Sequence, residues 1–286
     1  MTSSTDVFAE HRNLLFSVAY RMTGSVADAE DIVQNAWLRW SAADTSTVAT
    51  PVPYLVRTVT NLALDEMGSA RARRETYVGP WLPEPLLTSP DAADEVTMAE
   101  NLSLAMMVVL ETLSPLERAV FVLSDVFGFS LTEIAGMLDR DASAVRQLAH
   151  RARQHVQARR PRYEVDPSTR DELVAKFRDA CLGGDINAMM EILAPEVTAW
   201  SDGGGVVTAA RRPVHGRDNV TRWLFGVLAK PQAQGMEVEI ASINGEPALL
   251  ASSGGQVAGS VHLEIDGSTV VGIRMVLNPE KLDGLR

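Results

Sequence analysis

The chain has 286 residues, with 37 acidic and 26 basic side chains and a formal net charge of −11. That length is enough for two or three domains, each with its own apolar core. With one cysteine, Cys181, the chain cannot form an internal disulfide, and its N-terminus lacks the basic and apolar segments of a signal peptide. The longest apolar stretch, around residues 102–110, is too short to cross a bilayer. We therefore expect a cytoplasmic protein that does not contact membranes.

Residues 5–78 are expected to fold as a helical domain. A first helix has apolar residues at helical spacing and stops at Gly24. Ser25 is placed to cap a second helix, and Thr50-Pro51 opens a third. Trp37 and Trp40 fall on the apolar line of the second helix, which favours burial over a role in stacking on bases.

Residues 79–94 are expected to be a linker. Four prolines (Pro80, Pro83, Pro85 and Pro90) exclude a helix and favour extended chain. The same segment contains Trp81 and three leucines, which is too apolar for a freely solvated tether. We therefore expect the linker to dock on one of the domains.

Residues 95–160 are expected to form a second helical domain that ends in a helix-turn-helix. Capping-box spacing occurs twice, at residues 114–117 and 130–133, and each box precedes an apolar stripe. A turn at residues 139–141 leads into a last helix. That helix has one apolar face: Val145, Leu148, Ala149 and Ala152.

The other face of this last helix is polar and basic. Between Arg140 and Arg162 there are seven arginines and one acidic residue, in a chain that is acidic overall. An ordinary solvated surface would give a similar pattern, but the local excess of positive charge favours binding in a DNA major groove. DNA should repel the acidic chain as a whole, so a partner is expected to assist. The candidate DNA contacts are Ser143, Arg146, Gln147, His150, Arg151 and Arg153.

Residues 168–286 are expected to form an α+β domain, with helices first and a curled antiparallel sheet after them. Strands are predicted at residues 197–201, 206–209, 237–243, 248–252, 257–265 and 269–277, and Asp266-Gly267 predicts a hairpin turn. The histidines have no metal-ligand spacing, and we expect neither a metal nor a cofactor. Candidate acid–base residues, were the domain catalytic, are Asp202, His215, Asp218 and His262.

Two helical domains with a linker between them resemble an extracytoplasmic-function (ECF) sigma factor of bacterial RNA polymerase. Residues 27–37 (ADAEDIVQNAW) and 54–65 (YLVRTVTNLALD) resemble sigma region 2, and residues 113–153 resemble region 4. Three further segments resemble the SigJ-type subgroup, which carries a C-terminal SnoaL-like domain: residues 81–85 (WLPEP), 201–205 (SDGGG) and 278–282 (NPEKL). Val206 stands where that subgroup often has a lysine.

The resemblance implies a role for each set of residues. The partner would be core RNA polymerase, at its β′ clamp helices and β flap. Contacts to the clamp helices would involve Asp28, Glu30, Asp31, Gln34 and Asn35. Contacts to the promoter −10 element would involve Arg57, Asn61, Arg71, Arg73 and Arg74. The −35 element would be read by the helix-turn-helix. Regulatory contacts of the C-terminal domain would involve Trp81, Asp202, Gly203, Gly204, Gly205, Asn278, Pro279 and Lys281.

These patterns predict a protein that starts transcription in a stress response and is not an enzyme. One alternative is a one-component regulator whose C-terminal domain senses a small ligand. Another is an enzyme with a DNA-binding appendage. The resemblance also implies that the C-terminal domain is cone-shaped, and a small ligand in that cone is compatible with the first two interpretations.

Overall fold

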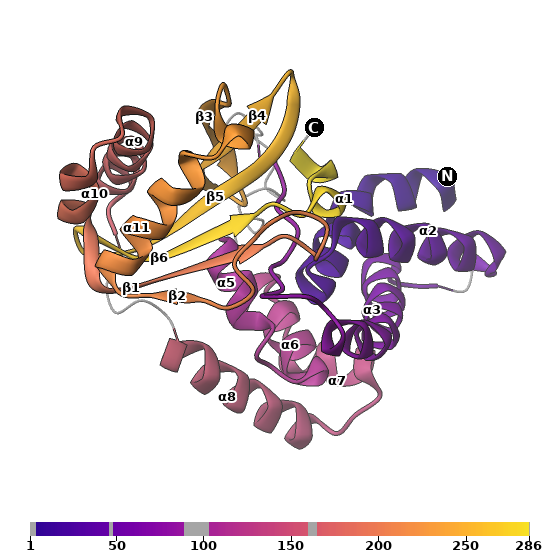
Figure 1. Ribbon diagram of the computed structural model, residues 1–286. Coiled ribbons are helices and arrows are strands. Elements are labelled where there is room, and N and C mark those ends of the chain that lie inside the picture. The colour runs from indigo at the N-terminus through magenta and orange to yellow at the C-terminus, as the bar shows by residue number, and fades with distance from the viewer. Residues whose placement is uncertain (1–3, 46–47, 89–102, 160–164, 286) are drawn as a thin grey trace. The chain divides into compact units, whose positions relative to one another are not determined.

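The computed structural model describes residues 4–45, 48–88, 103–159 and 165–285; within α3 (Pro51–Glu75) the side chains of residues 70–75 are not described. The chain forms two compact units. Residues of both predicted helical domains lie in the first unit, whereas Tyr77–Thr88 of the predicted linker lie in the second unit with the C-terminal part (Figure 1). The chain passes from one unit to the other within α5 (Leu104–Leu110).

The first unit begins with three helices, α1 (Ser4–Thr23), α2 (Val26–Ala42) and α3. The Ser25 side chain accepts a hydrogen bond from the Asp28 amide and so caps α2 as expected. Trp40 is buried, and its indole N–H donates to the Ser4 carbonyl oxygen at 2.7 Å. Trp37 is only half-buried and meets Phe8 edge to face. The predicted burial therefore holds fully for Trp40 and in part for Trp37.

The same unit continues with α6 (Pro115–Phe121), a π-helical turn η2 (Val122–Val126), α7 (Leu131–Leu138) and α8 (Ala142–Arg159). Both predicted capping boxes are formed, at the starts of α6 and α7. The α6 and α7 helices also pack against α3, and Arg118 of α6 is buried. The Arg118 Nε donates to the Arg21 carbonyl oxygen of α1 at 2.7 Å, and the Arg118 Nη1 forms an ion pair with Glu111. Burial lowers the pKa of Arg118 to about 9.

The second unit is a six-stranded sheet with three helices packed against it. The helices are α9 (Pro167–Gly183), α10 (Ile186–Ile192) and α11 (Arg217–Leu228). The strands are β1 (Leu193–Asp202), β2 (Val214–His215), β3 (Glu237–Ile243), β4 (Glu246–Ser253), β5 (Gln256–Asp266) and β6 (Thr269–Val276). Short 3₁₀ turns are η3 (Pro231–Ala233), η4 (Pro279–Lys281) and η5 (Asp283–Leu285). The expected α+β architecture is confirmed.

The order of strands in the sheet is β2-β1-β6-β5-β4-β3. All neighbours are antiparallel except β1 and β6, which are parallel, so the predicted antiparallel sheet is confirmed for four of the five strand pairs and is wrong for the pair of β1 with β6. The strand predicted at residues 206–209 was also wrong. The Val206 and Val207 amides both donate to the Gly203 carbonyl oxygen, which makes a tight turn instead of a ladder, and both side chains are exposed.

The core of the second unit lies between the helices and the sheet. Phe177 and Val174 of α9, Val220 of α11 and Ile273 of β6 belong to one buried apolar cluster. Cys181 is partly buried against this cluster, and burial raises the pKa of its thiol to about 12. The thiol is therefore protonated and unreactive at neutral pH.

Candidate DNA-binding helix and linker-docking site

The helix-turn-helix is built as the sequence predicts. The Ser130 side chain accepts from the Glu133 amide, while the Glu133 carboxylate accepts from the Ser130 amide at 2.8 Å. Asp139 ends α7 in the left-handed conformation (φ 51°), which turns the chain into α8. Five apolar side chains of α8 are buried: Val145, Leu148, Ala149, Ala152 and Val156.

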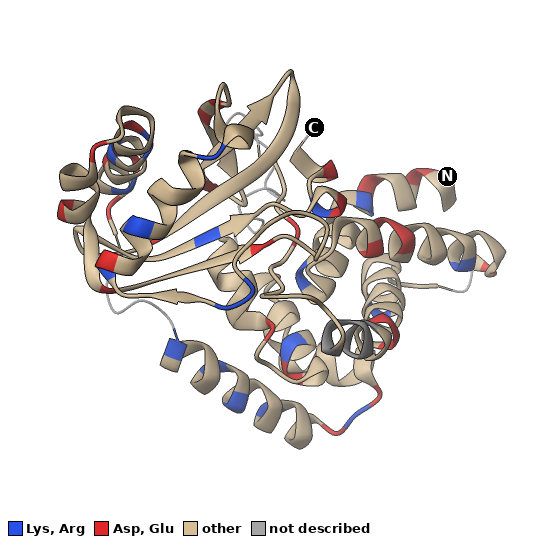
Figure 2. Ribbon diagram, viewed as in Figure 1, with Lys and Arg blue, Asp and Glu red and all other residues tan. Residues whose placement is uncertain are grey.

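The opposite face of α8 is exposed. Basic residues recur along this helix (Figure 2). Arg146 lies in the second turn, close to Gln147 and one turn before His150, so these side chains share one accessible face. The structure brings together, exposed on α8, all six residues named from sequence: Ser143, Arg146, Gln147, His150, Arg151 and Arg153.

Two of these arginines have acidic partners that the sequence analysis missed. The Arg151 Nε donates to Glu117 Oε1 at 2.8 Å, and the Arg153 Nε donates to Asp125 Oδ1 at 2.7 Å. Burial alone would raise the pKa of Glu117, but hydrogen bonds from Arg151 and Ser114 hold that pKa below its usual value. No local sequence pattern predicts these pairs, because their partners are 34 and 28 residues apart.

The other helical candidates occupy α2 and α3. On α2, Glu30, Asp31, Gln34 and Asn35 are exposed, opposite the buried apolar line, and Asp28 is half-buried. Glu30 also pairs with Arg12 at 2.5 Å.

On α3, Arg57 is exposed and Asn61 half-buried. The side chains of Arg71, Arg73 and Arg74 lie outside the part of the chain that the structure describes.

Asp202, at the end of β1, is the centre of the second site. It is fully buried, and its carboxylate accepts four hydrogen bonds. Oδ1 accepts from the Tyr77 hydroxyl at 2.6 Å and from the Gly204 amide at 3.1 Å. Oδ2 accepts from the Leu82 amide at 2.8 Å and from Lys281 Nζ at 2.8 Å. A buried carboxylate thus joins the linker, the glycine loop and the C-terminal segment.

Lys281 is the cation of this site and is almost completely buried. Its ammonium group also donates to the Leu82 carbonyl oxygen at 2.6 Å. It lies 4.2 Å from the centre of the Trp81 ring and 4.8 Å from that of Tyr77, within the range of cation–π attraction. Burial, and then the hydrogen bond to Asp202, raise the pKa of Tyr77. The hydroxyl of Tyr77 is therefore a donor at any physiological pH.

The three glycines after Asp202 are needed for close approach. A Cβ on Gly204 would lie 2.4 Å from the Asn278 side chain, and one on Gly203 would lie 2.7 Å from the Val207 carbonyl oxygen. Gly204 and Gly205 also have positive φ angles of 62° and 76°. Only glycine therefore fits at these positions, because any side chain would keep the loop from lying against the linker and the C-terminal segment.

Further along, the linker adds to the edge of the sheet. Leu87 forms an antiparallel bridge with Ile243 at the end of β3, and the Thr88 amide donates to the Ser242 carbonyl oxygen at 2.9 Å. The Leu87 amide donates to the Gly284 carbonyl oxygen at 3.0 Å. The expectation that the linker docks is confirmed, and its partner is the C-terminal domain.

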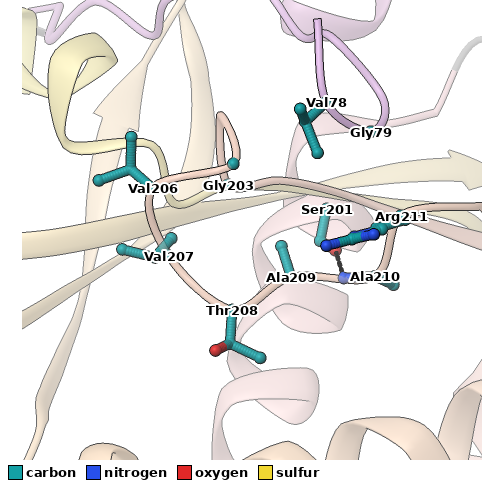
Figure 3. Close-up of a pocket in the computed structure, with 11 residues that line it drawn as sticks. Val78, Gly79, Ser201, Gly203, Val206, Val207, Thr208, Ala209, Ala210 and Arg211 are labelled. Carbon is teal, nitrogen blue, oxygen red and sulfur yellow. Dashed lines mark hydrogen bonds between the residues drawn. The ribbon is translucent and has the colours of Figure 1, made fainter.

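A cavity of about 270 Å³ lies beside the docked linker, lined by Val78, Gly79, Ser201, Gly203 and the loop from Gly205 to Arg211. Figure 3 shows Val78 and Gly79 facing this loop, with Arg211 beside Ser201 and Ala210. The Ser201 hydroxyl accepts from the Ala210 amide at 2.8 Å.

The four acid–base candidates occupy different environments. The carboxylate of Asp202 accepts hydrogen bonds from the linker. Asp218 and His215 are exposed, and His215 is hydrogen-bonded to Thr198. His262 is buried and bonded to Ser260, and burial followed by the nearby Arg274 lowers its pKa to about 3. Among the described residues, no group of three or more His, Cys, Asp or Glu is placed to hold a metal ion. Nor is any helix in that part of the chain long and apolar enough to span a membrane.

Comparison with known proteins agrees with this geometry. Residues 7–73 match the family model of sigma-70 region 2, and residues 103–156 match that of sigma-70 region 4. The chain therefore has the two helical regions of a sigma factor.

Curated relatives extend the match over almost the whole chain. The chain is 44% identical over 245 residues to the ECF RNA polymerase sigma factor SigJ of Mycobacterium tuberculosis, covering 84% of this chain and 78% of that protein. It is 34% identical over 284 residues to the probable ECF sigma factor SigI of the same organism, covering 96% and 93%. The crystal structure of Mycobacterium tuberculosis SigJ superposes with a TM-score of 0.79 at 35% identity, covering 98% of each chain. The chain belongs to the ECF RNA polymerase sigma factor family.

Proposed function

We propose that this protein binds core RNA polymerase, carries it to promoters and helps to open them, without chemistry of its own. The observation that supports this most directly is the exposed Arg146–His150 face of α8, held by a capped helix-turn-helix in a chain of the sigma factor family. A second helix of this kind reads base edges in the major groove through residues near its N-terminal end. Arg146 and Gln147 are the base-reading candidates, and Arg151 and Arg153 the phosphate contacts.

The remaining promoter and polymerase contacts follow from the same family. The exposed acidic face of α2, from Asp28 to Asn35, would meet the β′ clamp helices, and region 4 would meet the β flap. The exposed Arg57 and the half-buried Asn61 of α3 would hold the −10 strand, together with Arg71, Arg73 and Arg74 at the end of that helix. An arginine there neutralises phosphate while the unpaired bases are held in a polar site.

The C-terminal domain would regulate transcription by holding the linker between regions 2 and 4. Support comes from the buried Asp202–Lys281 pair and the hydrogen bonds of Leu82, Leu87 and Thr88. A linker bound at both Asp202 and β3 cannot extend freely, so its docking would limit how the two DNA-binding regions are spaced. If the domain takes a small ligand, the cavity beside Val78 is where that ligand would touch the linker.

A gel shift with and without core polymerase tests the main proposal. A sigma factor of net charge −11 should shift promoter DNA only with core enzyme present, whereas a one-component regulator would bind its site alone. Specific binding without polymerase, or no association with core enzyme, would refute the proposal. Transcription by the reconstituted enzyme with Asp202→Asn then tests the regulatory part, since unchanged promoter output would contradict a role for linker docking.

A further inference from the structure

Two acidic residues bracket the basic face of α8 from neighbouring helices. Glu117 comes from α6, and Asp125 comes from the π-helical turn η2 that continues α6. Arg151 is 53% exposed and Arg153 50% exposed, whereas Glu117 and Asp125 are 9% and 26% exposed. In each pair the carboxylate is therefore the fixed partner, and the arginine is the accessible one.

The carboxylates are themselves held in place. Glu117 Oε2 accepts from the Ser114 amide at 3.1 Å and from the Ser114 hydroxyl at 2.7 Å, so only Oε1 serves Arg151. Asp125 Oδ2 lies 2.5 Å from the Ser124 hydroxyl, which has one proton to donate either to this carboxylate or to the Val120 carbonyl oxygen at 2.8 Å. Because η2 is π-helical, with the Phe127 amide bonded to the Val122 carbonyl oxygen, the register of side chains shifts at this turn.

The geometry of the arginines leaves donors unused by these pairs. Arg153 binds Asp125 through its Nε and one terminal nitrogen, at 2.7 and 3.1 Å, which takes two of the five guanidinium N–H groups. Arg151 binds Glu117 through Nε, which takes one. Arg153 lies seven residues, or about two helical turns, beyond Arg146, and so on nearly the same side of α8.

We propose that Asp125 and Glu117 are positioning residues for promoter binding, which hold Arg153 and Arg151 with their remaining N–H groups toward the DNA backbone. The inference rests on the proposed function, in which α8 lies in the −35 major groove. A free arginine loses much rotamer freedom when it binds phosphate, whereas an arginine already held by a carboxylate loses less. The planar guanidinium suits this arrangement, because one edge can bind the carboxylate and the other a phosphate.

The direction in which one substitution changes DNA affinity distinguishes a positioning role from a simple effect of charge. Removing Asp125 makes the DNA-binding face more positive, and by charge alone that change tightens DNA binding. If Asp125 positions Arg153, the same change weakens binding, because Arg153 must then be ordered by the DNA. We expect Asp125→Ala to weaken −35-dependent binding of the polymerase complex about threefold to tenfold, and Asp125→Asn to weaken it less.

The experiment measures promoter affinity of the full-length chain with core polymerase, over a range of salt concentrations. The variants are Asp125→Ala, Asp125→Asn, Arg153→Ala and the Asp125→Ala/Arg153→Ala double variant. Glu172→Ala is the matched control, because it removes the acid of another exposed pair, with Lys176 at 2.7 Å on α9. Thermal unfolding and core-polymerase binding of each variant report any loss of folding.

Arg153→Ala should lower the slope of log affinity against log salt by about 0.9, as expected for one lost phosphate contact. In that background Asp125→Ala should no longer weaken binding. Equal or tighter binding by Asp125→Ala with Arg153 present overturns the inference, as does an equal loss in both backgrounds, which indicates a structural role. If Arg146→Ala and Arg153→Ala both leave binding and slope unchanged, the assignment of α8 to DNA fails, and this inference fails with it.

Discussion

The buried Asp202–Lys281 pair allows a quantitative test of linker docking. In Asp202→Asn the side chain keeps its shape, but one oxygen becomes an NH₂ group. If that group replaces Oδ2, it faces the Leu82 amide and Lys281 Nζ, both of which are donors. If it replaces Oδ1, it faces the Gly204 amide. Either orientation leaves a buried donor without an acceptor, and Lys281 loses its counter-charge.

Breaking a buried ion pair by removing one partner costs about 3–5 kcal/mol. With about 1.4 kcal/mol per factor of ten, linker undocking becomes more frequent by about two to three and a half orders of magnitude. Amide hydrogen exchange measures this directly, because the Leu82, Leu87 and Thr88 amides are bonded only while the linker is docked.

We expect protection of these three amides to fall together in Asp202→Asn, while protection in α7 and α8 stays as in the parent protein. The double variant Asp202→Asn/Lys281→Met should recover part of the protection, since it no longer buries an ammonium group that has lost the Asp202 carboxylate. Unchanged exchange at Leu82 and Leu87 in Asp202→Asn would refute the reasoning that this pair holds the linker.

Three further outcomes are expected. Gly204→Ala should lower the unfolding temperature more than Gly267→Ala, because both residues have positive φ but only Gly204 has a neighbour in the way of a Cβ; equal shifts would show that backbone strain alone matters. Arg146→Ala should cost about 1–3 kcal/mol at one −35 base pair, measured as transcription from a set of single-base promoter variants; a uniform fall across the set would contradict base reading. His262 is neutral when folded, with a pKa of about 3 against an ordinary value near 6.5, so its contribution to stability is present above pH 6.5 and is lost as pH falls toward 3. In His262→Gln the free energy of unfolding, measured with denaturant, should therefore fall less steeply over that pH range than in the parent protein, by up to about 1.4 kcal/mol per pH unit. Parallel plots of unfolding free energy against pH for the two proteins would contradict burial of the neutral ring.

Much of the helical half could be predicted from sequence, because its signals are local. The capping serines Ser114 and Ser130 and the apolar period of α8 lie within a few residues of the structure they specify. The partners of Arg151 and Arg153 could not be predicted, because they lie 34 and 28 residues away in the sequence. The position of Asp125 depends in addition on the π-turn at Val122–Val126.

The C-terminal half shows a similar division. Asp266-Gly267 and the alternating strands predicted the hairpin of β5 and β6 correctly. The parallel pairing of β1 with β6 depends on contacts about 75 residues apart, which no pattern of alternation contains. Residues 206–209 have the composition of a strand. The preceding glycines bend the chain into a turn, however, so these residues do not pair with the sheet. Apolar residues in the linker predicted that it docks, although no local sequence pattern predicts that it docks at Asp202.

Asp202 also connects the chain's last residues to its middle. Its carbonyl oxygen accepts from the Leu277 and Asn278 amides at 2.8 and 2.9 Å, while its carboxylate binds Lys281 and the linker. The linker position therefore depends on the tail at residues 277–285, and truncation of this tail or a fused affinity tag on it would disturb the Asp202 site. A purified preparation that has lost this tail, or carries a tag on it, would give promoter affinities that differ from those of the intact protein even though both DNA-binding regions are untouched.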